Sequence, residues 1–232
     1  MRLTATTYDK RLLEFQPLQF GQGERPSWWA ELKKTFQVLD HRTGIKVPNP
    51  TVKACPGVVD YIRKPMNIKL WSDAIFKVFP DGRINVSTPL HNGGEVSIGV
   101  HEQEQYGSLY PNHVVCKLHN PWVMEASDRT EFLCTDVHYD KEFRKHGMFI
   151  APGITNFYDQ HVCNIFIVFP RKEDPYQIEL KYGQPLMSVY PMTDKKINLK
   201  MKLATKQECQ DIANAFPPTF LGRYYTRKHA RR

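Results

Sequence analysis

His138 and Asp140 form the sharpest pattern for chemistry in this sequence. The spacing H-x-D places both side chains on one face of a strand, where a histidine and a carboxylate can bind a divalent metal ion as two ligands of a facial triad. The third ligand must come from further along the chain, and His146 and His161 are the nearby candidates. Neither lies at the longer separation that we expect for such a triad. We therefore interpret His138 and Asp140 as the polar end of a strand, and keep a metal site at His138, Asp140 and His161 as the alternative.

No complete catalytic motif accompanies this pair. The sequence contains no G-x-x-x-x-G-K-S/T, G-x-G-x-x-G, G-x-S-x-G or H-E-x-x-H, the spacings that bind phosphates or dinucleotides, activate a serine or hold a catalytic zinc ion. We assign no catalytic residue and no cofactor. A non-enzymatic role is favoured, and an enzyme stays open.

A basic and aromatic C-terminal segment is the clearest candidate for binding. The chain of 232 residues has a formal net charge of +8, and the last ten residues contribute five of these charges and no acidic residue. Arginine neutralises phosphate, and tyrosine stacks on bases or packs into a partner's groove. The sequence predicts a tail that binds DNA or a protein partner, with a solvated terminus as the alternative. The residues are Arg223, Tyr224, Tyr225, Arg227, Lys228, Arg231 and Arg232.

Cysteine usage and hydropathy bear on the compartment. The five cysteines are widely spaced and form no Cys-x-x-Cys pair, which predicts reduced thiols rather than a disulfide framework or a zinc site. The N-terminal residues lack the apolar segment of a secretory signal, and no run approaches the roughly 20 apolar residues that span a bilayer. We expect a cytosolic origin, without secretion through a signal peptide and without membrane contact.

Three segments have helical patterns. The first is predicted over residues 27–39, between Pro26 and Gly44, from the spacing of Trp28, Trp29, Leu32, Phe36 and Leu39. The second is predicted over residues 56–63, with Pro56 in its first turn and Pro65 just past its end. The third begins with the capping-box pattern Thr205-Lys206-Gln207-Glu208 and runs to about Ala215.

From Met66 onward apolar residues recur with a period of two, and Pro, Gly, Asn and Asp separate the runs. Residues 74–79 and 83–87 flank Pro80-Asp81-Gly82 and predict a hairpin. Further strands are predicted over residues 95–101, 113–119, 131–137, 161–169, 176–180, 186–190 and 197–203. Such a series of short strands predicts a mainly β fold, with an antiparallel sandwich or jelly-roll-like core, an N-terminal helix and a short C-terminal helix.

These elements suggest three parts of the chain. Residues 1–65 are predicted to form an N-terminal arm with helices that pack on the core, and residues 66–204 to form the β-sandwich core. Residues 205–232 are predicted to form the C-terminal helix and the basic tail.

The segment from Ala151-Pro152-Gly153 through two strands to the turn at Gly183 resembles the third-motif region of trimeric dUTP nucleotidohydrolases. The resemblance implies a β-barrel topology and, for an enzyme, nucleotide chemistry. The chain departs from the family at the functional positions. Asn156 stands where the family has its acidic residue, and the tyrosine, Tyr158, is displaced by one. Because an amide cannot act as a general base, we keep the topology and not the activity.

Short tags over residues 28–192 together resemble an uncharacterised β-rich, jelly-roll-like family of tailed bacteriophages. The tags are Trp28-Trp29, Ala54-Cys55-Pro56-Gly57, Lys69-Leu70-Trp71-Ser72-Asp73, His119-Asn120-Pro121-Trp122, Ala151-Pro152-Gly153, Gly183-Gln184-Pro185-Leu186 and Tyr190-Pro191. They place glycine and proline at strand junctions and tryptophan in the core. The resemblance implies a phage origin, with the protein in the virion or the host cytoplasm, and brings no activity.

Together these observations predict a non-enzymatic virion or assembly protein. Its terminal arms would contact other copies of itself or other virion proteins, and its basic tail could bind DNA. Two alternatives stay open. One is a metal-dependent or nucleotide-processing β-barrel enzyme, cupin-like or dUTPase-like. The other is a carbohydrate-binding module that uses exposed tryptophan and tyrosine.

Overall fold

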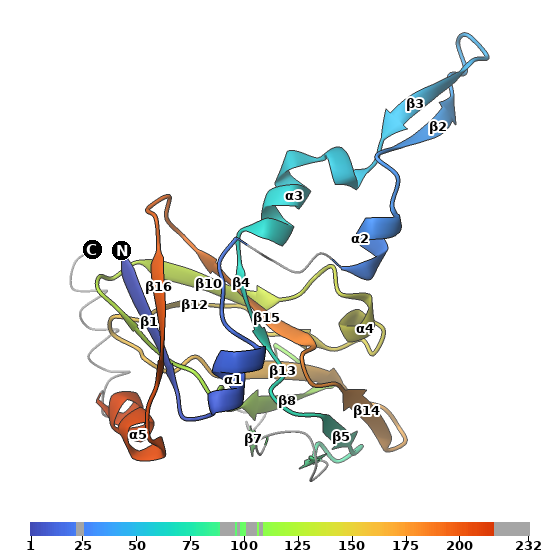
Figure 1. The fold of residues 1–232 in the computed structure, drawn as a ribbon. Helices are drawn as coiled ribbons and strands as arrows, with labels where there is room; N and C mark the ends of the chain where they lie inside the picture. The colour runs from blue at the N-terminus through green and yellow to red at the C-terminus, as the bar shows by residue number, and fades with distance from the viewer. Residues whose placement is uncertain (22–25, 89–95, 97, 101–105, 107–108, 216–232) are drawn as a thin grey trace.

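The structure is a computed structural model that describes residues 1–21, 26–88, 96, 98–100, 106 and 109–215 (Figure 1). Strands dominate these residues, and most neighbouring strands run antiparallel. The predicted mainly β class is confirmed, and the arrangement is consistent with a sandwich-like fold.

The helical elements are short. They are α1 (Lys10–Phe15), α2 (Ser27–Glu31), the 3-10 helix η1 (Val52–Ala54), α3 (Pro56–Arg63), α4 (Lys141–Arg144) and α5 (Lys206–Asn214). The strands are β1 (Arg2–Thr7), β2 (Thr35–Leu39), β3 (Lys46–Pro50), β4 (Met66–Lys69), β5 (Ala74–Val78), β6 (Ile84–Ser87), β7 (Ile98–Val100), β8 (His113–Leu118), β9 (Val123–Ala126), β10 (Glu131–Asp136), β11 (Phe149–Ile150), β12 (Gly153–Asn156), β13 (Ile165–Pro170), β14 (Tyr176–Leu180), β15 (Pro185–Pro191) and β16 (Asn198–Leu203).

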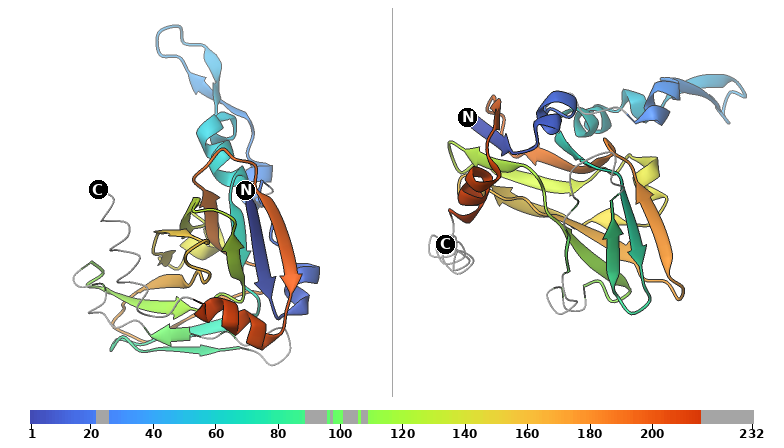
Figure 2. Two further views of the ribbon diagram at one scale, coloured as in Figure 1. Left: turned by 90° about the vertical axis from the view of Figure 1, so that its left-hand side faces the viewer. Right: turned by 60° about the horizontal axis from the view of Figure 1, so that its bottom comes forward.

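Four sheets form the body of the molecule, and Figures 1 and 2 show them gathered together. Their strand orders are β16-β1-β9, β12-β10-β15-β4, β11-β13-β8-β7 and β14-β5-β6. A fifth sheet, the hairpin β2-β3, stands away from the others with α2, η1 and α3. We call residues 26–63 the arm.

One hydrophobic core joins the four body sheets. Aromatic pairs contribute to it. The rings of Phe76 and Phe169, from β5 and β13 of different sheets, lie 5.4 Å apart, and those of Phe132 on β10 and Phe157 just after β12 lie 4.8 Å apart. The run that precedes Phe169 forms β13, an interior strand between β11 and β8, as its continuous apolar character suggests.

β1 is the central strand of its sheet. It pairs antiparallel with β9 and parallel with β16, with Arg2 opposite Asn198. The amino group of Met1 also donates to the carbonyl of Lys196, 2.8 Å away and 195 residues distant in sequence. Leu3 and Ala5 lie fully buried in the core. This strand belongs to the part of the chain for which the sequence suggested an arm.

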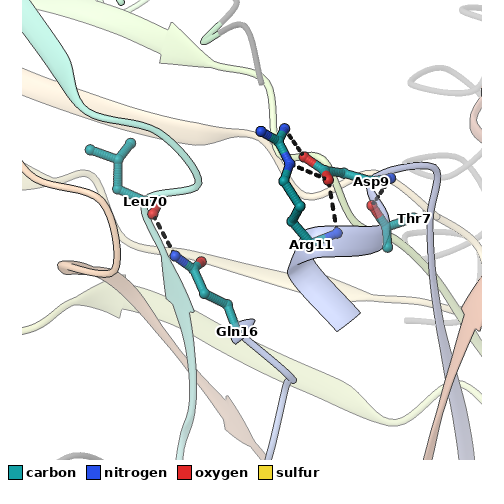
Figure 3. A network of polar contacts seen from close by, with 5 residues as sticks. All are labelled: Thr7, Asp9, Arg11, Gln16 and Leu70. Carbon is teal, nitrogen blue, oxygen red and sulfur yellow. Dashed lines mark hydrogen bonds and ion pairs between the residues drawn. The ribbon is translucent and has the colours of Figure 1, made fainter. Parts of the chain in front are cut away.

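α1 follows β1 and is fixed by polar contacts at both of its ends (Figure 3). The Asp9 carboxylate caps the helix, accepting from the amide of Arg11 at 3.0 Å and from its guanidinium at 2.7 Å. The Arg11 hydrogen bond holds the pKa of Asp9 below its usual value. At the other end, the buried Gln16 donates to the carbonyl of Leu70 at 3.1 Å.

The helix predicted over residues 27–39 is wrong in its second half. Helix α2 ends at Glu31, and residues 35–39 form β2, which pairs with β3 across a turn at residues 40–44. Thr35 and Val38 are β-branched and Phe36 is aromatic, types that favour a strand. Gly44, at φ +67°, takes the left-handed conformation that lets the chain turn back.

Other predicted elements are confirmed. α3 and β14 have the predicted bounds, and α5 begins at the predicted capping box. The hairpin β5-β6 also forms, with Gly82 at φ +91° in its turn. The predicted strand over residues 95–101 lies partly outside the described residues, which include β7.

Candidate functional site

The arm is the part of the described chain that leaves the body, and its tip is the β2-β3 hairpin (Figures 1 and 2). Alternation divides the hairpin into two faces, because successive side chains of a strand point to opposite sides. Phe36, Val38, Val47 and Ile45 share one face, and the opposite face carries mainly polar residues and proline. Phe36 is 50% exposed, Ile45 63% and Val47 42%. Within the described part of the chain, no second layer covers this apolar face of the hairpin.

The turn of the hairpin is held by one carboxylate. Asp40 accepts from the backbone amide of Arg42 and from the hydroxyl of Thr43, each at 2.9 Å. These hydrogen bonds, led by that of the Arg42 amide, lower the pKa of Asp40. The tip therefore has a defined shape without contact to the body.

Two side chains close the neck of the arm. The hydroxyl of Thr51 donates to the carbonyl of Lys33 at 2.7 Å, and the ammonium of Lys53 donates to the carbonyl of Leu32 at 2.9 Å. The chain entering β2 is thereby tied to the chain leaving β3. The arm is held as one unit from its neck to its tip.

Aromatic side chains anchor the base of the arm to the body. The Trp28 indole donates to the carbonyl of Tyr139 at 2.7 Å, and the hydroxyl of Tyr190 donates to the carbonyl of Tyr61 at 2.7 Å. The Tyr61 ring lies 5.0 Å from that of Tyr190 and 5.4 Å from that of Tyr139. Burial raises the pKa of both the Tyr61 and Tyr190 phenols, which keeps the Tyr190 hydroxyl a neutral hydrogen-bond donor.

A small cavity of about 210 Å³ lies at this junction, lined by residues of the arm, of β4 and β15 and of the segment after β10. Tyr61, His138, Asp140 and Ser188 are among its lining residues. Sites for drug-sized ligands and cofactors have about 300–1,000 Å³. The cavity is large enough for only a small molecule.

Beside the cavity, Asp136 forms a pair with His138. Asp136 is 2% exposed, its Oδ1 lies 2.9 Å from His138 Nδ1, and its Oδ2 accepts from Arg144 Nη1 at 3.3 Å. Burial raises the pKa of Asp136, against the opposing effects of His138 and Arg144. His138 Nδ1 also lies 3.3 Å from Arg144 Nη1, so the imidazole lies beside both the Asp136 carboxylate and the Arg144 guanidinium. In the described residues, no serine, threonine or cysteine is hydrogen-bonded to His138 to serve as a nucleophile.

The structure gives other roles to two of the three residues predicted as alternative metal ligands. The Asp140 carboxylate caps α4 and accepts from the amide of Phe143 at 2.8 Å. His161 Nδ1 lies 3.1 Å from the carbonyls of both Met124 and Phe157. Among the residues that the structure describes, no group of three or more His, Cys, Asp or Glu side chains could hold a metal ion.

The segment that resembles dUTP nucleotidohydrolases uses its amide for structure. Asn156 is buried at the end of β12, and its side-chain oxygen accepts from the amide of Asp159 at 2.8 Å. Tyr158 is exposed, and the Arg129 guanidinium lies 5.1 Å from the centre of its ring. These contacts shape a turn.

Tryptophan does not form an exposed platform here. Trp29, Trp71 and Trp122 are buried, and Trp28 is half-buried with its indole N–H engaged by Tyr139. These four are the tryptophans of the chain. Exposed tyrosines such as Tyr8, Tyr158 and Tyr182 are the surface aromatics that remain for a sugar-binding alternative.

The predicted basic tail, Arg223 to Arg232, lies outside the described residues. All five cysteines are free thiols; Cys55 is exposed and the other four are buried. Of the described helices, none has both the length and the apolar character to cross a membrane.

Two features, the apolar face of the hairpin and the pairing of His138 with Asp136, were not predicted. The apolar face of the hairpin was readable as the alternation of Phe36 and Val38, followed by the Asp40 to Gly44 turn. The carboxylate partner of His138 is Asp136 rather than Asp140, and both lie two residues from the histidine. Comparison of the sequence with protein-family models and with curated proteins finds no match.

Proposed function

We propose that this protein is a structural or assembly protein whose arm contacts neighbouring subunits of a larger particle. The observation that carries the proposal is the apolar face of the β2-β3 hairpin, which is exposed and remote from the core. A two-stranded hairpin alone is at best marginally stable in water. A neighbouring subunit would supply the apolar contact that the body does not.

The resemblance of residues 28–192 to a family of tailed bacteriophages supports the same role. A virion presents many identical neighbours at fixed positions, so one projecting arm on each subunit can be used repeatedly. We propose a bacteriophage virion or assembly protein, found in the virion or the host cytoplasm. Its partners are other copies of itself or other virion proteins.

Sedimentation velocity over a range of concentrations tests the role of the arm. We expect the unmodified chain to associate and the double variant Phe36→Ser, Val47→Ser to lose most of that association. The matched control is Phe15→Ser, because Phe15 is 68% exposed on α1 of the body. The proposal fails if the double variant associates as the unmodified chain does. It also fails if the chain is monomeric at all concentrations and its arm is freely cleaved by protease in purified particles.

We propose that DNA is a second partner, bound through the tail. Five basic residues between Arg223 and Arg232, with no acidic residue, support this. Each neutralised phosphate contributes about 0.9 to the slope of log affinity against log salt. Deleting residues 223–232 should remove most of the DNA binding and reduce that slope by a few units. An unchanged slope would place the contact elsewhere in the chain.

One observation favours a second candidate, a small-molecule enzyme. Asp136 and His138 lie together beside the cavity at the base of the arm. This candidate predicts that the purified protein binds a small polar molecule in the cavity, and that His138→Ala abolishes the binding whereas His161→Ala does not. Absence of such binding in a screen of small polar molecules would eliminate it.

A further inference from the structure

The two edges of the β2-β3 hairpin differ. The amide of Asp40 donates to the carbonyl of Ile45, and the amide of Thr51 donates to the carbonyl of Lys34, each at 2.9 Å. In an antiparallel pair, hydrogen-bonded positions alternate with positions whose amides and carbonyls point outward. The even-numbered residues of β2 therefore bond to β3. The backbone groups of Thr35, Gln37 and Leu39 point to the outer edge of β2.

Proline blocks the outer edge of β3. The same alternation places the nitrogens of Lys46, Pro48 and Pro50 on that edge, opposite Leu39, Gln37 and Thr35. Two of the three nitrogens carry no hydrogen, so this edge cannot form a regular ladder with another strand. On β2, by contrast, all three outward amides are intact. Among the described residues, none of them has a hydrogen-bond partner.

We propose that the outer edge of β2 pairs with β2 of a second copy of this chain. The two strands run antiparallel about a two-fold axis at Gln37 and join the two hairpins into one four-stranded sheet. This inference rests on the proposed assembly function and names its partner. The register centred on Gln37 is the one in which all five residues of each β2 strand are paired.

Side chains in this register are complementary. Phe36 lies opposite Val38 of the second copy, so aromatic and β-branched side chains pair twice across the axis, a favourable cross-strand combination. Lys34 lies opposite Asp40 of the second copy, which pairs opposite charges at both ends of the joint. Asp40 is ionised at neutral pH, because its hydrogen bonds to Arg42 and Thr43 lower its pKa.

The proline edges make the assembly closed. In the four-stranded sheet, both outer edges are β3 strands, each with Pro48 and Pro50. A strand from a third copy has no complete row of donors to pair with. The pairing therefore stops at two copies and does not extend into a fibre.

Two proline substitutions test the edge directly. Gln37→Pro removes one outward N–H from β2, and Lys46→Pro removes one outward N–H from β3; both leave the hydrogen bonds within the hairpin intact. We expect Gln37→Pro to weaken dimerisation, measured by sedimentation equilibrium, by about tenfold or more, since each dimer loses two hydrogen bonds. Lys46→Pro should change it less than twofold. Equal effects of the two variants would overturn the proposal.

Cross-linking tests the register. In a Cys55→Ser background, Gln37→Cys should cross-link to itself with a short bis-maleimide, because residue 37 meets its own copy on the axis. Lys46→Cys, on the far edge of each hairpin, should not. The double variant Phe36→Ser, Val47→Ser can abolish the dimer while the dimer of the Cys55→Ser background cross-links through Lys46→Cys or through neither position. That combination would refute β2 pairing and leave the assembly role standing. A chain that binds particles through the arm without dimerising refutes the second copy as the partner.

Discussion

The body and the arm contain the same kind of element in opposite surroundings. In the body, β5 alternates between buried and less buried residues, and Phe76 of β5 and Phe132 of β10 lie in the core. In the arm, residues 35–38 of β2 alternate between polar and apolar types, yet Phe36 is half exposed and β3 has no buried residue. An amphipathic strand is thus stabilised only where a second layer covers its apolar face. In the arm, we propose that a partner supplies that layer.

The largest effect that separates the two regions is expected from phenylalanine truncation. Phe132→Ala removes a fully buried ring and should lower the free energy of unfolding by about 3–5 kcal/mol, through lost burial and the cavity left behind. Phe36→Ala in the monomer should change it by less than about 0.5 kcal/mol. Denaturant unfolding at low protein concentration measures both. A comparable loss in the two variants would mean that the arm folds against the body.

A smaller effect is expected where the arm meets the body. Tyr190→Phe removes the hydroxyl that donates to the carbonyl of Tyr61, which should cost about 1 kcal/mol and speed protease cleavage of the arm. Tyr158→Phe, at an exposed tyrosine of the body, is the control and should have little effect. Unchanged cleavage in Tyr190→Phe would show that Trp28 and the ring contacts suffice to anchor the arm.

The smallest effect is expected in the pH dependence of stability. Burial raises the pKa of Asp136, so just above the usual carboxyl pKa the native state binds its proton more tightly than the unfolded chain does. The contribution of Asp136 to the free energy of unfolding therefore falls as pH rises above the usual carboxyl pKa. Asp9 has the opposite sign: Arg11 lowers its pKa, so its contribution is present above the usual value and is lost as pH falls.

Unfolding of Asp136→Asn and Asp9→Asn, measured from pH 3 to pH 7, checks these signs. In the unmodified protein, Asp136 makes the free energy of unfolding fall as pH rises, and Asp136→Asn should abolish that fall. Asp9 makes the free energy of unfolding rise with pH, and Asp9→Asn should abolish that rise. The same sign in both variants would contradict the assignment of burial as the dominant effect at Asp136.

The sequence predicts the body better than the arm, for a physical reason. A strand such as β14 is visible because one of its faces lies against the core and the alternation of apolar and polar residues records it. β1 was not predicted, because its partners are residues 123–126 and 198–203, and local pattern carries no information on pairing at that distance. α3 and α5 were predicted from Pro56 and Thr205, whose roles at helix ends are local.

The hairpin of the arm and the His138–Asp136 pair were predicted less well. Phe36 and Leu39 fit helical spacing by coincidence, and the Asp40 to Gly44 turn overrides that spacing. Asp136 and Asp140 both lie two residues from His138, so spacing alone does not identify which carboxylate is its partner. That its carboxylate is buried follows only from the packing of the sheets.

The position of β1 has a consequence for how the chain is made. During synthesis Arg2 is made long before its neighbour Asn198, so the sheet β16-β1-β9 cannot close until residues 198–203 have also been made. Contacts of such high sequence separation slow folding. The arm, complete by residue 63, leaves the ribosome while the body is still unfinished. The hairpin is therefore made, with its apolar face, before the body is complete. If two arms pair as we propose, their encounter would not require a finished body.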